Sequence, residues 1–154
     1  MSKQIYVNMP VKDLKKTKEF FAKVGFTFNP AFTNDDATCM IIGEDIYVML
    51  LVEKFFKTFI KKDIIDTKKY TEAIMGIAVE SRKEVDNMVE KAIKAGGKKT
   101  GKDYDHGWMY GKSFEDLDGH IWELFYMDES KAPQKERKET LEIFTENGPK
   151  TIRP

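Results

Sequence analysis

Residues 114–126 read FEDLDGHIWELFY, and this stretch decides the fold. Asp118-Gly119 in front of an apolar run is typical of a tight turn that leads into a strand. The strand carries one carboxylate, Glu123, between Trp122 and Leu124. A charge in mid-strand is costly when it is buried without a partner. Glu123 therefore either faces water or lines a cleft in which it has a chemical task, and the residues alone leave both interpretations open.

The composition of the 154-residue chain favours one soluble domain. Its 26 basic and 26 acidic side chains give no net charge, which argues against a nucleic-acid binder that relies on a general basic field. The single cysteine, Cys39, excludes an internal disulfide and favours a reducing compartment. No apolar run reaches the ~20 residues of a membrane span, and the first residues lack the apolar region of a signal peptide. We therefore expect a cytoplasmic protein without nucleic-acid or membrane partners.

The same order of predicted elements occurs twice, with an offset of about 70 residues. Helical spacing predicts helices from Asp13 to Val24 and from Ser81 to Ala95, each ended by glycine. Alternating or apolar runs bounded by turn residues predict the strands, at residues 4–9, 26–32, 37–42, 46–52, 71–79, 98–104, 108–115 and 120–127. Pro10 is expected to end the first strand.

A single βαβββ repeat cannot bury one face of its sheet alone, but two repeats can do so together. The repeat therefore predicts an α+β fold. We expect a curved eight-stranded mixed sheet around a cleft, with the helices outside. Repeat 1 covers about residues 4–52, a linker 53–70, and repeat 2 about 71–127, together one domain over residues 1–127.

The linker and the C-terminal extension have weaker patterns. A short helix is expected over residues 55–60, and its three phenylalanines (Phe55, Phe56 and Phe59) pack on the domain, cover the open side of the cleft or meet a partner. The extension, residues 128–154, is expected to hold a short helix over residues 134–144 that docks on the domain or on a partner subunit, or stays loose.

Two segments carry a family resemblance. Residues 7–26, VNMPVKDLKKTKEFFAKVGF, resemble the first strand and helix of the vicinal oxygen chelate superfamily, which includes glyoxalase I, bleomycin-resistance and fosfomycin-resistance proteins and extradiol dioxygenases. Residues 114–124, FEDLDGHIWEL, resemble its closing turn and strand, with Leu117 in place of the usual proline. The resemblance covers residues 4–127 and implies the paired βαβββ fold.

The resemblance also implies a divalent metal (zinc, nickel, manganese or iron) that polarises vicinal oxygens of a substrate. Four positions of this chain match the ligand positions of glyoxalase I: Tyr6, Met49, Ile74 and Glu123. Only Glu123 keeps a ligand, because a phenol and a thioether bind such cations poorly and isoleucine has no donor atom. The cleft is therefore expected to work either with a rearranged metal site or with no metal.

Neither histidine falls on an expected ligand position. His120 is expected in the turn or at the surface, whereas His106 is a candidate acid/base or substitute ligand at the mouth of the cleft, or a plain loop residue. The ligand-binding residues predicted beside Glu123 are mostly aromatic or apolar: Tyr6, Asn8, Tyr47, Met49, Ile74, Trp108 or Tyr110, and Phe125.

These observations favour a protein that binds a small organic ligand without the complete metal site, in the manner of the bleomycin-resistance proteins. The alternative is a metal-dependent lyase that resembles glyoxalase I (lactoylglutathione lyase), with ligands rearranged around Glu123. The resemblance further implies a homodimer, since single-domain members often pair and some build the cleft between subunits.

Overall fold

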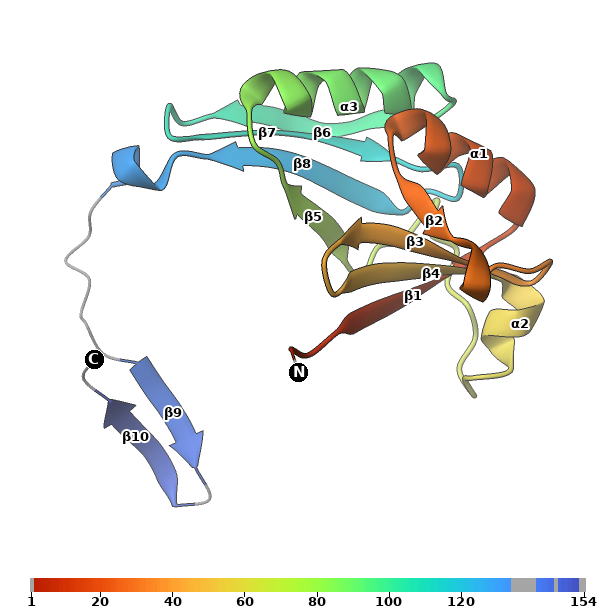
Figure 1. Cartoon of the computed structure of the whole chain (residues 1–154), viewed down its shortest axis with the longest axis horizontal. Helices are drawn as coiled ribbons and strands as arrows, with labels where there is room; N and C mark the ends of the chain where they lie inside the picture. The colour runs from red at the N-terminus through yellow and green to blue at the C-terminus, as the bar shows by residue number, and fades with distance from the viewer. Residues whose placement is uncertain (1, 134–140, 146, 153–154) are drawn as a thin grey trace.

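Two βαβββ repeats follow one another along the chain, as the computed structural model shows (Figure 1). The structure describes residues 2–133, 141–145 and 147–152. Repeat 1 contains β1 (Ile5–Val11), α1 (Leu14–Val24), β2 (Thr27–Asn29), β3 (Ala37–Gly43) and β4 (Ile46–Val52). Repeat 2 contains β5 (Ile74–Ala78), α3 (Arg82–Lys94), β6 (Lys98–Asp105), β7 (Met109–Glu115) and β8 (Ile121–Met127).

The eight strands are divided between two mixed four-stranded sheets with the same topology. The strand orders are β1-β4-β3-β2 and β5-β8-β7-β6, so the first strand of each repeat lies at a sheet edge and pairs in parallel with the last. The remaining pairs in both sheets are antiparallel. This layout confirms the predicted α+β class and the repeat.

Both long helices begin and end where the sequence predicts. The Asp13 side chain accepts a hydrogen bond from the Lys16 backbone N–H at 3.0 Å, and Ser81 caps α3 in the same way. Gly25, with a φ of 123°, closes α1 in a conformation that favours glycine. Helical spacing then turns one face of each helix into the core, which buries Thr17, Phe20, Phe21 and Val24 on α1 and Val85, Val89 and Ala92 on α3.

One hydrophobic core joins the two repeats. The Phe21 ring of α1 meets the Trp122 ring of β8 at a centroid distance of 5.1 Å, and Phe20 lies 6.1 Å from Phe114 of β7. All four side chains are at most 1 % exposed. The first helix therefore packs on the second sheet as well as on its own, and neither repeat has a complete core by itself.

The Asp116–His120 turn is built around a buried carboxylate. Asp116 accepts hydrogen bonds from the backbone N–H groups of Asp118 and His120 at 2.9 and 3.0 Å, and from the Trp122 indole at 3.0 Å. Burial raises the pKa of the Asp116 carboxyl above its ordinary value, and these donors act in the opposite direction. The turn is thus a fixed structure rather than a loose connection.

The same turn reaches across to repeat 1. Asp118 accepts a hydrogen bond from the Lys12 backbone N–H at 3.0 Å, and the Thr17 hydroxyl lies 3.5 Å from its second oxygen. The His120 ring donates from Nε2 to the Pro10 carbonyl at 2.8 Å. Three polar contacts therefore fasten the second repeat to the junction of β1 and α1.

Several expectations need correction. β1 continues through Pro10 to Val11, because β1 is an edge strand and the missing N–H of proline can face away from β4. The second strand is only β2, since Asn29 caps a 3₁₀ turn, η1 (Pro30–Phe32). The short linker helix α2 is Glu53–Lys57, two residues earlier than expected. His120 is in the turn but not at the surface, being 8 % exposed.

The C-terminal extension is also different from its prediction. After a short 3₁₀ turn, η2 (Glu129–Lys131), it forms an antiparallel hairpin of β9 (Leu141–Thr145) and β10 (Gly148–Ile152). Residues 134–140 of the expected helix lie outside the described residues, and residues 141–144 are strand. A short run with apolar residues at 141, 143 and 144 fits strand alternation nearly as well as a helical face. None of the helices in the described part of the chain is long and apolar enough to cross a membrane.

Replacing Asp118 by alanine tests the connection between the repeats. The change leaves the part-buried Lys12 N–H without its acceptor, so we expect Asp118→Ala to lower the free energy of unfolding by about 2 kcal/mol in urea denaturation, with an unchanged m-value. Asp35→Ala, at an exposed loop position, is the control and should stay within about 0.5 kcal/mol of the wild type. Equal stabilities of the two variants would contradict this role.

Candidate functional site

Four of the predicted ligand-binding residues share one face of the first sheet. Tyr6 pairs with Tyr47 and Asn8 with Met49 across the β1–β4 ladder, and the two tyrosine rings stack at 4.7 Å. Their neighbours in the strands are buried in the core under α1, so strand alternation turns these four side chains away from the helices. Tyr6 is 45 % exposed.

Three more predicted residues share the corresponding face of the second sheet. Trp122 and Leu124 are buried in the core, so Glu123 and Phe125 point to the opposite side of β8. Ile74 of β5 lies on that side as well and is 59 % exposed. In the single chain the predicted site is therefore divided between two separate sheets.

Glu123 has a partner that the sequence did not predict, Tyr104. The Tyr104 hydroxyl donates to Glu123 Oε1 at 2.9 Å. Burial, followed by this bond, raises the pKa of Tyr104 to about 12, so the phenol stays protonated and acts as a donor. Among the described residues, Glu123 Oε2 has no hydrogen-bond partner, which leaves one carboxylate oxygen available to a ligand.

A glycine makes room for this pair. Tyr104 of β6 lies opposite Gly111 of β7, and a Cβ at Gly111 would come within 2.3 Å of the Tyr104 ring. No other residue fits under the ring without moving it. The sequence pattern does not reveal this pairing, because it depends on a shift of the β6–β7 register between Thr100 and Tyr104.

His106 joins the same group through its ring. The imidazole stacks on the Tyr104 ring at a centroid distance of 5.5 Å and an interplanar angle of 23°. The structure thus brings the two predicted catalytic residues, His106 and Glu123, to the two sides of one tyrosine. His106 itself is exposed and follows β6 directly.

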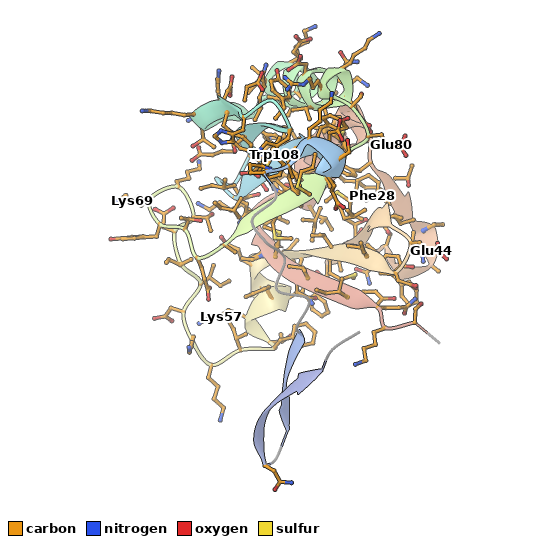
Figure 2. The ribbon with its side chains drawn as sticks, turned by 90° about the vertical axis from the view of Figure 1, so that its left-hand side faces the viewer. Phe28, Glu44, Lys57, Lys69, Glu80 and Trp108 are labelled. Carbon is orange, nitrogen blue, oxygen red and sulfur yellow. The ribbon has the colours of Figure 1, made fainter. Side chains whose placement is uncertain are left out.

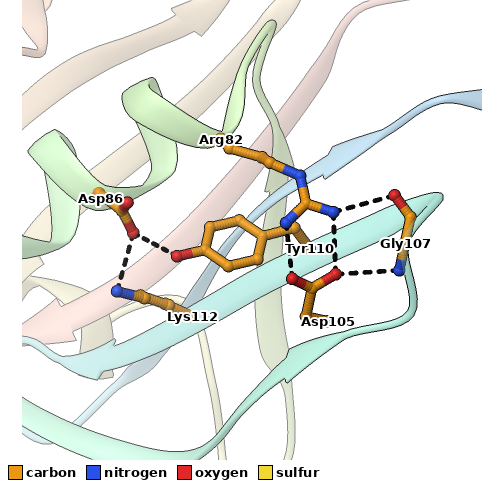
Figure 3. Close-up of polar contacts among 6 residues, drawn as sticks. All are labelled: Arg82, Asp86, Asp105, Gly107, Tyr110 and Lys112. Atoms are coloured by element: carbon orange, nitrogen blue, oxygen red, sulfur yellow. Dashed lines mark hydrogen bonds and ion pairs between the residues drawn. The ribbon is translucent and has the colours of Figure 1, made fainter.

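An ion-pair cluster on the other side of the sheet fixes the end of the β6–β7 hairpin (Figure 3). Arg82 donates to both carboxylate oxygens of Asp105 at 2.7 and 2.8 Å, and also to the Gly107 carbonyl at 2.9 Å. The guanidinium lowers the pKa of Asp105 to about 2. Asp105 lies between Tyr104 and His106. Its two hydrogen bonds with Arg82 of α3 therefore hold the strand end from which both rings project.

Tyr110 belongs to that cluster and not to the predicted cleft. Its hydroxyl donates to Asp86 of α3 at 2.6 Å, and Arg82 lies 4.8 Å above its ring (Figure 3). Tyr110 therefore lies on the helix side of β7, on the face opposite Glu123, because strand alternation sets the face of each residue. Trp108 lies just before β7 and is half-buried, and its carbonyl accepts from the Asp128 N–H at 2.7 Å.

The residues present do not fit the metal that the family resemblance implies. Of the four ligand positions, Tyr6 and Met49 lie on one sheet and Ile74 and Glu123 on the other, and Glu123 is the only carboxylate among them. No three His, Cys, Asp or Glu side chains of the described residues are arranged to hold a metal ion. A single carboxylate that already accepts from a phenol is a weak anchor for a divalent cation.

A pocket large enough for a small molecule lies elsewhere. It has a volume of about 730 Å³ and is bounded by β1, the segment of residues 56–73 and the Gly119-His120 turn. Asn8 is the one predicted ligand-binding residue that lines it. Of the three linker phenylalanines, Phe56 lines the pocket, whereas Phe59 is 68 % exposed and contacts the Phe55 ring.

Comparisons with known proteins bear on the fold. No protein-family model matches the sequence, and no curated protein matches it. A hypothetical protein from S. aureus has a similar structure, with a TM-score of 0.70, 27 % identity, and coverage of 82 % of this chain and 94 % of that one.

Two solved structures from further organisms are named for their family. A glyoxalase/bleomycin resistance protein/dioxygenase family enzyme from Burkholderia phytofirmans has a TM-score of 0.67 at 16 % identity, and the match covers 82 % of this chain and all of that one. A glyoxalase-related enzyme from Fulvimarina pelagi has a TM-score of 0.70 at 14 % identity and matches 99 % of this chain and 98 % of that one. The chain therefore has the fold of the vicinal oxygen chelate superfamily, and the resemblance noted in its sequence is confirmed.

Proposed function

We propose that this protein binds a small organic molecule at Glu123, and that the molecule combines an apolar or aromatic body with an amine or another hydrogen-bond donor. The observation that carries the proposal is the bond from Tyr104 to Glu123 Oε1, which fixes the carboxylate while Oε2 stays available. Phe125 and Ile74 lie on the same face of the sheet as Glu123. Such a surface suits the body of the ligand, and the carboxylate suits its cationic or donor end.

The proposal does not use a metal, because the donor set around Glu123 does not fit one. The alternative, a lyase resembling glyoxalase I, draws support from the position of His106 beside Tyr104. That lyase would still need ligands from Tyr6, Met49 and Ile74, which provide a phenol, a thioether and no donor atom. Binding without a complete metal site is therefore the better-supported function.

We further infer that two chains form a homodimer that completes the ligand site. The faces opposite the helices expose large side chains on both edge strands: Tyr6 of β1 is 45 % exposed and Ile74 of β5 is 59 % exposed. Large apolar side chains that face water on a sheet face are candidates for burial against a partner. Placing the first-sheet face of one chain against the second-sheet face of another would bring Tyr6, Tyr47 and Met49 to Glu123.

The buried, unpaired Cys39 suits the reducing cytoplasm expected from the sequence.

Calorimetric titration with tryptamine, an aromatic amine, tests the ligand class. We expect tryptamine to bind more tightly than indole-3-acetate, because the carboxylate of Glu123 attracts the first compound and repels the second. Glu123→Gln should weaken tryptamine binding by about tenfold, the value of one charged hydrogen bond. Glu90→Gln, an exposed position on α3, is the matched control and should bind as the wild type does. Equal affinities for the two compounds, or no effect of Glu123→Gln, would refute the assignment.

Sedimentation equilibrium of charged variants tests the dimer. Ile74→Lys places a charge on the proposed interface at a position that is 59 % exposed in the single chain, so we expect a folded monomer where the wild type is a dimer. Ile93→Lys, at an exposed apolar position on α3 that the interface does not include, should remain dimeric. A monomeric wild type, or an Ile74→Lys variant with the mass of a dimer, would contradict the proposed dimer.

A further inference from the structure

The pocket beside the linker is separate from the Glu123 site. Its floor is the end of β1, and its roof is the segment of residues 56–73, which Figure 2 shows on the stretch between Lys57 and Lys69 along one side of the molecule. Glu123, Tyr104 and Phe125 do not line it. Its volume of about 730 Å³ lies within the range of cavities that hold small organic molecules.

The walls of this pocket are mostly apolar. Six side chains from the strands, α2 and the linker account for much of the lining: Met9, Phe56, Ile60, Ile64, Ala73 and Met75. Ile65 and Tyr70 add large apolar surface at the rim, where they are 48 % and 62 % exposed. An apolar molecule with an aromatic ring system would remove this surface from water.

Hydrogen bonds and close packing fix the conformation of the roof. The Thr67 hydroxyl donates to the Asp118 carbonyl, and the backbone around Thr67 packs so closely on Gly119 that a Cβ there would come within 2.7 Å of it. Within the segment, the Lys57 ammonium donates to the Lys62 carbonyl at 2.9 Å and to Asp63 at 3.1 Å. These contacts hold the cavity open without requiring a ligand to form it.

His120 gives the pocket one directional polar group. A carbonyl oxygen can only accept, so the contact with Pro10 assigns the proton to Nε2, and Nδ1 of the neutral ring is then an acceptor. Nδ1 has no hydrogen-bond partner among the described residues, and no side-chain nitrogen or oxygen among them is both fully buried and unpaired. Because the His120 ring lines the pocket, Nδ1 is the acceptor that this ring can offer to a ligand there.

We propose that this pocket is a second ligand site, which takes a flat aromatic molecule carrying a hydroxyl group that donates to His120 Nδ1. The apolar walls bind the ring system, and the acceptor nitrogen sets its orientation. Because His120 also holds Pro10 at the end of β1, a bound hydroxyl sits next to the contacts that fasten the two repeats together. The site is independent of the function proposed for Glu123.

Fluorescence titration with 2-naphthol tests the second site, with 2-methoxynaphthalene as the matched compound that lacks the donor. We expect saturable binding of one 2-naphthol per chain, about three- to tenfold tighter than the methyl ether, which is the value of one neutral hydrogen bond. His120→Gln keeps a donor for the Pro10 carbonyl but has no acceptor at the position of Nδ1, since its Oε1 lies elsewhere on the side chain, so it should reduce the difference between the compounds. Ile93→Lys, on α3 and outside the pocket lining, should leave both affinities unchanged.

A second variant keeps the test decisive if His120→Gln fails to fold. Ala73 lines the pocket from an exposed position, so Ala73→Trp should fill the cavity without disturbing the core and weaken 2-naphthol binding by at least about tenfold. Absence of saturable binding to the wild type, equal affinity for the two compounds, or an undiminished affinity in Ala73→Trp would each overturn the proposal.

Discussion

The hydrogen bond from the Lys12 backbone N–H to the buried Asp118 carboxylate is the contact on which the rest of the structure depends. It joins the Asp116–His120 turn of the second repeat to the junction of β1 and α1 in the first repeat. Asp116 shapes that turn, His120 adds a bond to Pro10, and the Phe21–Trp122 contact fills the space beneath it. No strand of one sheet pairs with a strand of the other, so this polar turn and the shared core hold the two repeats together.

Packing the helix sides of both sheets into one core has a consequence for function. It turns the opposite faces outward, and these faces carry the residues expected to form the cleft. Glu123 is consequently held by Tyr104 from its own sheet, while Tyr6 and Met49 belong to the other. The fold is shared with glyoxalase-related proteins, but fold does not fix function, and the proposal of an organic ligand rests on the side chains at these positions.

Much of the fold could be predicted from the sequence, because local signals agree with the tertiary structure. Asp13, Gly25 and Ser81 mark the helix ends, and the repeat predicts the strand order. The site was harder to predict, since it depends on which residues face each other across strands. Tyr104 reaches Glu123 only because the β6–β7 register shifts beyond Thr100 and places it over Gly111, and that shift left no signal in the hydrophobic pattern. Tyr110 was misplaced for the same reason, because its strand face turns it toward α3. The contact of His120 with Pro10 could not be predicted either, since the two residues are far apart in the sequence.

The central claim is that Glu123 is held by the Tyr104 hydroxyl and presents its other oxygen to a ligand. An NMR titration of ¹³C-labelled tyrosine measures this contact directly. We predict that the pKa of Tyr104 is about 12 in the wild type. In Glu123→Gln the pKa should fall toward, but not reach, the ordinary 10.0, because burial remains after the carboxylate is removed. A Tyr104 that titrates near 10.0 in the wild type, or with the same pKa in both proteins, would contradict the account.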